Sequence, residues 1–145
     1  MVKKADEQKK DDEELQRRYV HLQILKQQLN AMIEEKNALN EKAAELTTTI
    51  DALNKFEDIK KGEEIWSSLG SGAFVRSDIK DVSDVLVAVG AGVVVKETRE
   101  RGITIIKGRF EELQKLDQEL VAEINKFAEQ VQRLESQLKH AVENR

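Results

Sequence analysis

The chain has 145 residues and a formal net charge of −4, with 36% charged, 39% hydrophobic and 4% aromatic residues. Acidic and basic residues are interspersed, so the sequence lacks the broad basic surface with which proteins neutralise nucleic-acid phosphates. It contains no cysteine, which excludes disulfides, thiolate metal sites and cysteine nucleophiles. It contains no proline either, and its wealth of Glu, Lys, Gln, Leu and Ala is typical of long helices.

The amino-terminal sequence MVKKADEQKKDDEE lacks the apolar core of a signal peptide. No stretch approaches the roughly 20 consecutive apolar residues of a membrane span. We therefore expect a soluble, cytoplasmic protein with a single domain over residues 1–145, and neither a membrane nor nucleic acid as a partner.

Two segments carry a heptad pattern in which 21 of 24 core positions are apolar. Such a pattern predicts two helices that each contribute one side of a coiled-coil seam. We expect the helices over about residues 6–58 and 103–143. In the first, the a positions are Leu15, Leu22, Leu29, Lys36, Ala43 and Ile50, and the d positions are Arg18, Leu25, Met32, Leu39, Leu46 and Leu53. In the second, they are Ile103, Phe110, Asp117, Ile124, Val131 and Leu138 at a, and Ile106, Leu113, Leu120, Phe127, Leu134 and Ala141 at d.

The two seams have the same length, which suggests that they pair with each other. If the chain turns back between them, the helices run antiparallel and facing residue numbers sum to about 156. Asp117 then lies one helical turn from Lys36. The two side chains either pair across the seam and fix its register, or reach solvent independently.

Between the two predicted helices, residues 63–98 approximately follow a different sequence pattern. Short β-branched and aromatic runs alternate with glycine, which predicts four strands in two hairpins. The turns are Gly70-Ser71-Gly72 and Gly90-Ala91-Gly92, because glycine tolerates the positive φ that tight turns need. The second hairpin repeats the first at a spacing of twenty residues, so that LGSGAFV corresponds to VGAGVVV.

These glycines do not form a nucleotide loop. A dinucleotide-binding fingerprint requires a third glycine where Val75 and Val95 stand, and a helix rather than a strand after the loop. The strand VLVAV is apolar on both faces and must be covered, so we expect the hairpins to join other subunits.

Candidate catalytic groups are few. The two histidines, His21 and His140, lack further ligands for a metal site, and the serines of the hairpins have no histidine to act as a base. The sequence therefore indicates neither an enzyme nor a cofactor.

The far ends of the helices carry apolar residues outside the seam, namely Tyr19, Val20, Ile24 and Val142. They form either a contact site for an apolar partner or a wider seam.

A helix, two linked hairpins and a second helix resemble an alpha-type prefoldin subunit, especially an archaeal one. The matching stretches are LGSGAFV and IKDVSDVLVAVGAGVVVKE. Beta-type subunits of that family have one hairpin, so the second hairpin favours the alpha type. Gly102 and Gly108 stand where the family usually has helix formers, and leave the start of the second helix open between Thr98 and Arg109.

The resemblance implies an α+β fold and an ATP-independent chaperone without a cofactor. It implies that hairpins from two copies of this chain and from beta-type subunits build a β-barrel platform in a hetero-hexamer. The coiled-coil tips would capture unfolded polypeptides for delivery to a group II chaperonin. The platform role falls on Ile65, Phe74, Val75, Val85, Val87, Val89, Val93, Val94 and Val95, with turns at Gly70, Gly72, Gly90 and Gly92. The capture role falls on Tyr19, Val20, Leu22, Ile24, Leu25, Leu134, Leu138 and Val142.

One alternative uses the same fold. The edges of the hairpins could add subunits without limit and build a structural filament or scaffold, instead of a closed complex that holds clients.

Overall fold

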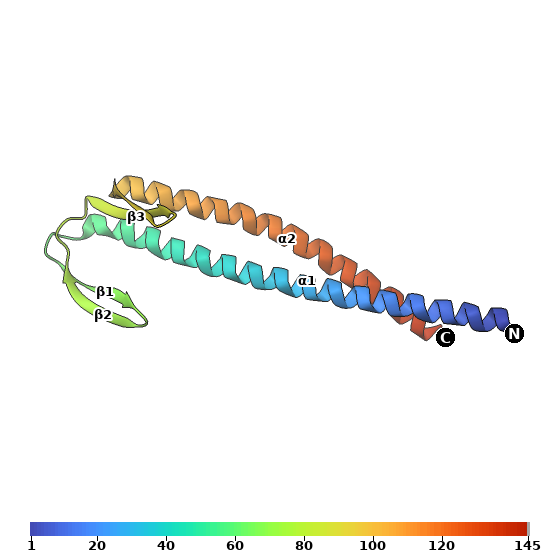
Figure 1. Ribbon diagram of the computed structural model, residues 1–145. Helices are drawn as coiled ribbons and strands as arrows, with labels where there is room; N and C mark the ends of the chain where they lie inside the picture. Colours follow the sequence, from blue (N-terminus) through green and yellow to red (C-terminus); the bar gives the residue numbers. More distant parts are fainter. Residues whose placement is uncertain (145) are drawn as a thin grey trace. The chain divides into compact units, whose positions relative to one another are not determined.

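The computed structural model describes residues 1–144 and contains two long helices with two antiparallel hairpins between them (Figure 1). This arrangement confirms the predicted fold class. The elements are α1 (Val2–Lys55), the short 3-10 helix η1 (Phe56–Asp58), β1 (Glu64–Gly70), β2 (Ala73–Asp78), β3 (Asp84–Gly90), β4 (Val93–Thr98) and α2 (Arg99–Glu143). They form two compact units. Residues 1–40 and the part of α2 from Lys115 onward form the distal unit, and residues 41–114 form the hairpin unit.

Both helices begin earlier than the seam pattern predicts. Helix α1 begins at Val2, because the Lys, Glu, Gln and Ala residues that make up most of the segment before the seam are good helix formers even though all of them are exposed. Helix α2 begins at Arg99, four residues before the first seam position. The hydroxyl of Thr98 accepts a hydrogen bond from the backbone N–H of Arg101 at 3.2 Å, which caps the amino end of this helix.

In the distal unit, α1 and α2 run antiparallel and bury a narrow seam. Leu22 and Leu25 of α1 are buried with Val131 and Leu138 of α2. Partly buried side chains extend this cluster on both helices, namely Leu15, Leu29, Phe127 and Leu134. Of all the predicted a and d residues in both helices, Arg18 alone is exposed. The heptad assignment therefore identifies the buried face of each helix.

The polar residues of the seam form an ion pair. The Nζ of Lys36 lies 2.8 Å from Oδ1 of Asp117, and each side chain is 31% exposed. A second pair, Lys26 with Glu135, joins the two helices nearer their far ends at 2.6 Å. The residue numbers of these pairs lie on either side of the predicted sum, so both pairs agree with the antiparallel register. Of the two possibilities for Lys36 and Asp117, the structure shows the cross-seam pair.

We expect the effects of Lys36→Leu and Asp117→Leu on stability to be coupled. Each single change leaves a partly buried charge without its partner, whereas the double change fills the seam with apolar side chains. The coupling energy should be about 1 kcal/mol, since the pair is partly solvated, and the double variant should be more stable than either single variant. Urea unfolding of the four proteins measures this energy. Purely additive effects would show that the pair contributes nothing as a pair.

The hairpin unit has its own apolar cluster. Leu46 and Leu53 of α1, Ile106 of α2 and Val87 of β3 are buried together. Hairpin 2, which comprises β3 and β4, thus packs one face on the helices, and Figure 1 shows β3 beside their ends. The guanidinium group of Arg99 joins the helix ends, because it donates to the carbonyl oxygen of Leu53 at 3.1 Å.

Gly102 of α2 allows this close packing. A Cβ atom at that position would lie 2.6 Å from Cγ2 of Val85 and 3.6 Å from Cγ2 of Val87. Arg109, two turns further along α2, donates a hydrogen bond to the carbonyl oxygen of Ala88. Hairpin 2 is therefore fixed to α2 by side-chain packing and by a polar contact.

The two hairpins have equivalent geometry. In hairpin 1, which comprises β1 and β2, Trp66 pairs with Arg76, and the register shifts by one residue between Ser68 and Gly70. In hairpin 2, Leu86 pairs with Lys96 and the same shift occurs twenty residues later. The backbone has positive φ at three consecutive residues of each turn, with 92° at Gly70 and 107° at Gly90. Glycine removes the steric cost of this conformation at most of these positions.

A short polar link joins the hairpins. The backbone N–H and the hydroxyl of Ser83 donate to Oδ1 of Asp81 at 2.9 and 2.7 Å. The backbone bond, followed by the hydroxyl bond, holds the pKa of the Asp81 carboxyl below its usual value. The carbonyl oxygen of Ser83 accepts a hydrogen bond from the backbone N–H of Arg99 at 2.9 Å, so this link also positions the start of α2.

Candidate functional site: exposed apolar surfaces

An apolar surface lies on the outside of the distal unit. Tyr19, Val20, Ile24 and Val142 are between 47% and 60% exposed, and we call these four residues the distal surface. All four lie outside the heptad core positions: Tyr19 and Val142 flank the seam, and Val20 and Ile24 lie on the outer side of α1. The distal surface is available to a partner without any rearrangement of the helices.

The other residues to which the sequence assigns a capture role lie in the seam. Leu22, Leu25 and Leu138 are buried between the helices, and Leu134 is partly buried against them. Their side chains stabilise the coiled coil in this arrangement. The structure thus divides the eight predicted capture residues into four exposed and four seam residues.

Charged side chains are absent from the segment of α1 that carries the distal surface. From Tyr19 to Leu25 there is no Lys, Arg, Asp or Glu. The next charge, on Lys26, is paired with Glu135, and the charge on Arg18 is paired with Glu14 at 2.8 Å. Arg17 lines the same hollow as Val20. An apolar ligand that covers only residues 19–25 therefore contacts no charged side chain of that segment.

Hairpin 2 has one covered face and one exposed face. Val87 is buried and Val85 and Val95 are partly buried on the face toward the helices. On the opposite face Leu86 is 73% exposed, and Val94 is exposed beside it. A single subunit therefore leaves a large apolar side chain of this hairpin in water.

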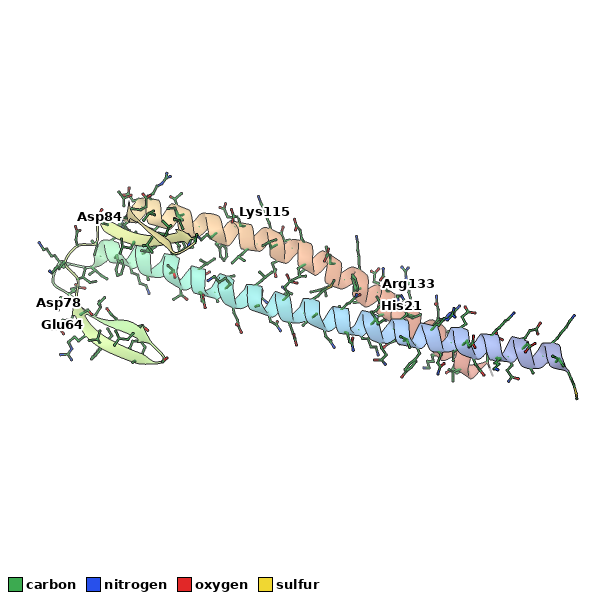
Figure 2. All side chains as sticks on the ribbon, in the orientation of Figure 1. His21, Glu64, Asp78, Asp84, Lys115 and Arg133 are labelled. Atoms are coloured by element: carbon green, nitrogen blue, oxygen red, sulfur yellow. The ribbon has the colours of Figure 1, made fainter. Side chains whose placement is uncertain are left out.

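Hairpin 1 exposes apolar side chains on both faces. Trp66 and Phe74 are exposed on one face, and Leu69 and Val75 on the other. The guanidinium carbon of Arg76 lies 5.2 Å from the centre of the Trp66 ring, which is a cation–π arrangement. Figure 2 shows Glu64 and Asp78 together at the open end of this hairpin. A two-stranded sheet with so little cover requires a partner.

The structure places the predicted platform residues in unequal environments. Val87 is buried and Ile65, Val85 and Val95 are partly buried, whereas Phe74, Val75, Val89, Val93 and Val94 are exposed. The predicted set omits three exposed residues, Trp66, Leu69 and Leu86. Strand alternation could have identified them, because Leu86 lies on the opposite face of its strand from Val85 and Val87, and Trp66 on the opposite face from Ile65.

No ionisable side chain of residues 1–144 is fully buried. His21 and His140 are both exposed, and Figure 2 shows His21 on the distal part of α1. No group of three or more His, Asp or Glu side chains with the geometry of a metal site occurs in residues 1–144. Neither helix, as far as Asn144, contains a segment apolar and long enough to cross a membrane.

Comparison with protein families identifies this arrangement. The family model described as "Prefoldin subunit" matches residues 25–144, which include most of α1, both hairpins and α2. The chain belongs to the prefoldin family. Prefoldins are chaperones, and the resemblance to the alpha type is confirmed by curated relatives. The "Prefoldin subunit alpha" of Methanococcus vannielii is 29% identical over 127 residues, which are 88% of this chain and 85% of the relative.

Two further alpha subunits give the same result. That of Archaeoglobus fulgidus is 28% identical and aligns with 88% of this chain and 93% of its own length. That of Methanosarcina barkeri is 32% identical over 111 residues, which are 77% of this chain and 74% of the relative.

Solved prefoldin structures have the same fold. Filamentous prefoldin from Methanocaldococcus jannaschii, solved by cryo-electron microscopy, superposes with a TM-score of 0.70 at 18% identity over 79% of this chain and 95% of its own. The prefoldin beta subunit of Thermococcus strain KS-1 superposes with a TM-score of 0.60 at 17% identity over 88% of this chain and 91% of its own. At these identities the likeness concerns the fold.

Proposed function

We propose that this prefoldin subunit is an ATP-independent holdase of the cytoplasm. Its distal surface captures unfolded polypeptides and the complex passes them to a group II chaperonin. Its hairpins join a second copy of the chain and beta-type subunits in a β-barrel platform. The observation that carries the proposal is the distal surface, which has four exposed apolar side chains, three of them in a segment of α1 without Lys, Arg, Asp or Glu.

The chemistry of an unfolded client suits this surface. An unfolded chain exposes apolar side chains in no fixed order, so a site that recognises it must bind apolar area without a demand for one sequence. Exposed apolar side chains on the outside of a coiled coil have this property. Because binding of this kind comes from surface burial, it needs neither a nucleotide nor a metal.

The exposed faces of the hairpins support the assembly part of the proposal. Each hairpin leaves large apolar side chains in water in a single subunit, and each has strand edges without a partner in residues 1–144. Strands from neighbouring subunits would cover both the faces and the edges, which a barrel achieves by closure.

The test is a reconstitution with a beta-type prefoldin subunit. We expect one discrete particle by native mass spectrometry, and this particle should suppress the light scattering of a chemically denatured protein that is diluted without ATP. Addition of a group II chaperonin with ATP should then raise the yield of refolded client. A discrete particle that fails to suppress aggregation would contradict the holdase function.

The filament is the second candidate, and a specific observation favours it. The M. jannaschii neighbour is described as filamentous prefoldin. Electron microscopy of the chain alone and of the mixture with a beta-type subunit separates the two functions. Long polymers in both samples, without suppression of aggregation, would support a structural role.

A further inference from the structure

The coiled-coil seam is incompletely filled at its distal end. In the antiparallel register, Leu15 faces Ala141, the last predicted core residue of α2. The next d position of α1 holds Arg18, which is exposed and pairs with Glu14. A hollow of about 270 Å³ lies at this end of the seam, lined by these four residues and Asp11. We call it the seam-end hollow.

The floor of the seam-end hollow is apolar. Leu15 packs against the buried cluster of the distal unit, and Ala141 is partly buried. Elsewhere in this seam large side chains from both helices pack together, as Leu25 and Val131 do, whereas the small side chain of alanine leaves space. Helix α2 ends two residues after Ala141, and Figure 1 shows α1 continuing past that end. The floor is therefore reached from the open end of the seam.

Charged side chains surround the mouth of the seam-end hollow. Asp11 and Glu14 are exposed and, being three residues apart, lie next to each other on α1. Arg18 donates a hydrogen bond to Glu14 at 2.8 Å. Two carboxylates and one guanidinium group give the lining a net charge of −1 at pH 7. The mouth therefore attracts a cation, and Asp11 is the acid that Arg18 does not neutralise.

An apolar floor below an acidic mouth fits the side chain of a lysine or an arginine. Its aliphatic stem can cover Leu15 and Ala141 while its charged head stays in water beside Asp11 and Glu14. A wholly apolar side chain would cover the floor without using the charge, and a carboxylate would be repelled. The hollow, at about 270 Å³, is smaller than the roughly 300–1,000 Å³ of small-molecule sites, which suits a single side chain.

The seam-end hollow adjoins the distal surface. Its residues Arg18 and Ala141 directly precede Tyr19 and Val142, which flank the seam. A polypeptide that crosses the open end of the seam can therefore place apolar side chains on Tyr19 and Val142 and a neighbouring basic side chain in the hollow.

We propose that the seam-end hollow binds a lysine or arginine side chain of the unfolded polypeptide that the distal surface holds. The inference rests on the proposed function and adds a preference to it, because apolar segments that contain a basic residue are then held more tightly than apolar segments without one. The charges are solvated, so the preference should be about threefold to fivefold, as for an exposed ion pair.

Peptide binding to the complex reconstituted with a beta-type subunit tests this preference. Three fluorescein-labelled, unstructured peptides of apolar residues and serine differ only at the central position, which is lysine, norleucine or glutamate. Norleucine keeps the aliphatic stem of lysine without its charge. In fluorescence anisotropy at low salt, the lysine peptide should bind about threefold to fivefold more tightly than the norleucine peptide, and the glutamate peptide should bind most weakly. High salt should reduce these differences.

Variants of this chain assign the preference to the seam-end hollow. Asp11→Asn should lower the affinity for the lysine peptide to within about twofold of that for the norleucine peptide. Asp11→Lys should reverse the order, so that the glutamate peptide binds more tightly than the lysine peptide. Ala141→Leu should reduce the preference with every acid retained, because the larger side chain fills the floor. The matched control is Asp6→Asn, which removes the same charge from α1 outside the lining and should keep the preference.

The outcomes separate this inference from the proposed function. Equal binding of the lysine and norleucine peptides to the original complex, or an unchanged preference in Asp11→Asn, would overturn the inference and leave capture by the distal surface intact. If Asp11→Asn keeps the preference but alters the mass of the complex, the hollow contacts a neighbouring subunit instead. A complex that binds none of the three peptides would contradict the proposed function, and the role of the hollow as a client site with it.

Discussion

Replacement of Tyr19, Val20, Ile24 and Val142 by serine is expected to remove most of the holding activity. Full burial of a large apolar side chain contributes about 1.5–3 kcal/mol, and these four are about half exposed before a client binds. The variant complex should therefore require at least about tenfold more protein to suppress aggregation by half. Light scattering of a diluted, denatured client measures this concentration. The mass of the complex should be unchanged, because the substituted side chains lie outside the hairpin unit.

The matched control changes two exposed apolar residues elsewhere in the distal unit. Ile33 and Leu116 are 41% and 51% exposed, and their replacement by serine removes a comparable apolar area per residue. This control should retain nearly full activity. Equal losses in both variants would show that clients bind general apolar area along the coiled coil and that the distal surface has no special role.

The second large effect concerns two glycines of the same helix. Gly108→Ala should stabilise the protein by about 1 kcal/mol, because alanine is the better helix former and a Cβ at Gly108 meets no atom within 4 Å. Gly102→Ala has the same gain in propensity, but its Cβ would approach Val85 Cγ2 to 2.6 Å. Valine cannot withdraw one methyl group without leaving its preferred rotamer, and overpacking of this kind costs about 1–3 kcal/mol. We therefore expect the two variants to differ by about 2 kcal/mol in unfolding free energy.

Denaturant unfolding of both variants measures the difference, and a third variant identifies its cause. Val85→Ala removes the methyl group that a Cβ at position 102 would strike. In that background, Gly102→Ala should be neutral or stabilising, as in the Gly108 control. If Gly102→Ala stabilises the original protein as much as Gly108→Ala does, hairpin 2 does not pack on α2 as the structure has it.

Sequence periodicity predicts the parts of this fold that depend on local rules. The heptad positions identify the seam because burial on a helix follows a period that the residues themselves display. The glycine pairs locate the turns because few residues adopt positive φ. The antiparallel register places Lys36 and Asp117 within one helical turn of each other, but it leaves open whether they pair, and the structure shows that they do.

Other features depend on contacts that no local pattern contains. The early start of α2 depends on the hydroxyl of Thr98, whereas the glycine at position 102 argues against a helix until its contact with Val85 is known. Burial of Leu22, Leu25 and Leu138 separates them from Tyr19 and Ile24, although all five are apolar neighbours in sequence or space. The difference in burial between the two hairpins likewise depends on tertiary contacts. Val85 and Val87 of hairpin 2 pack in the apolar cluster of α1 and α2, and no residue of hairpin 1 belongs to that cluster.

The apolar cluster around Leu25 and Val131 shares no residue with the one around Leu53 and Ile106. Residues that pack in one cluster tend to open together. The backbone amides around the two clusters should therefore exchange with different free energies of opening. Hydrogen–deuterium exchange read by mass spectrometry would show this as separate protection for residues 15–30 and 46–55. An opening confined to the distal cluster would expose its leucines beside Tyr19 and Ile24 while the hairpins stay folded. The apolar area offered to a client would then grow with the local unfolding of the coiled coil.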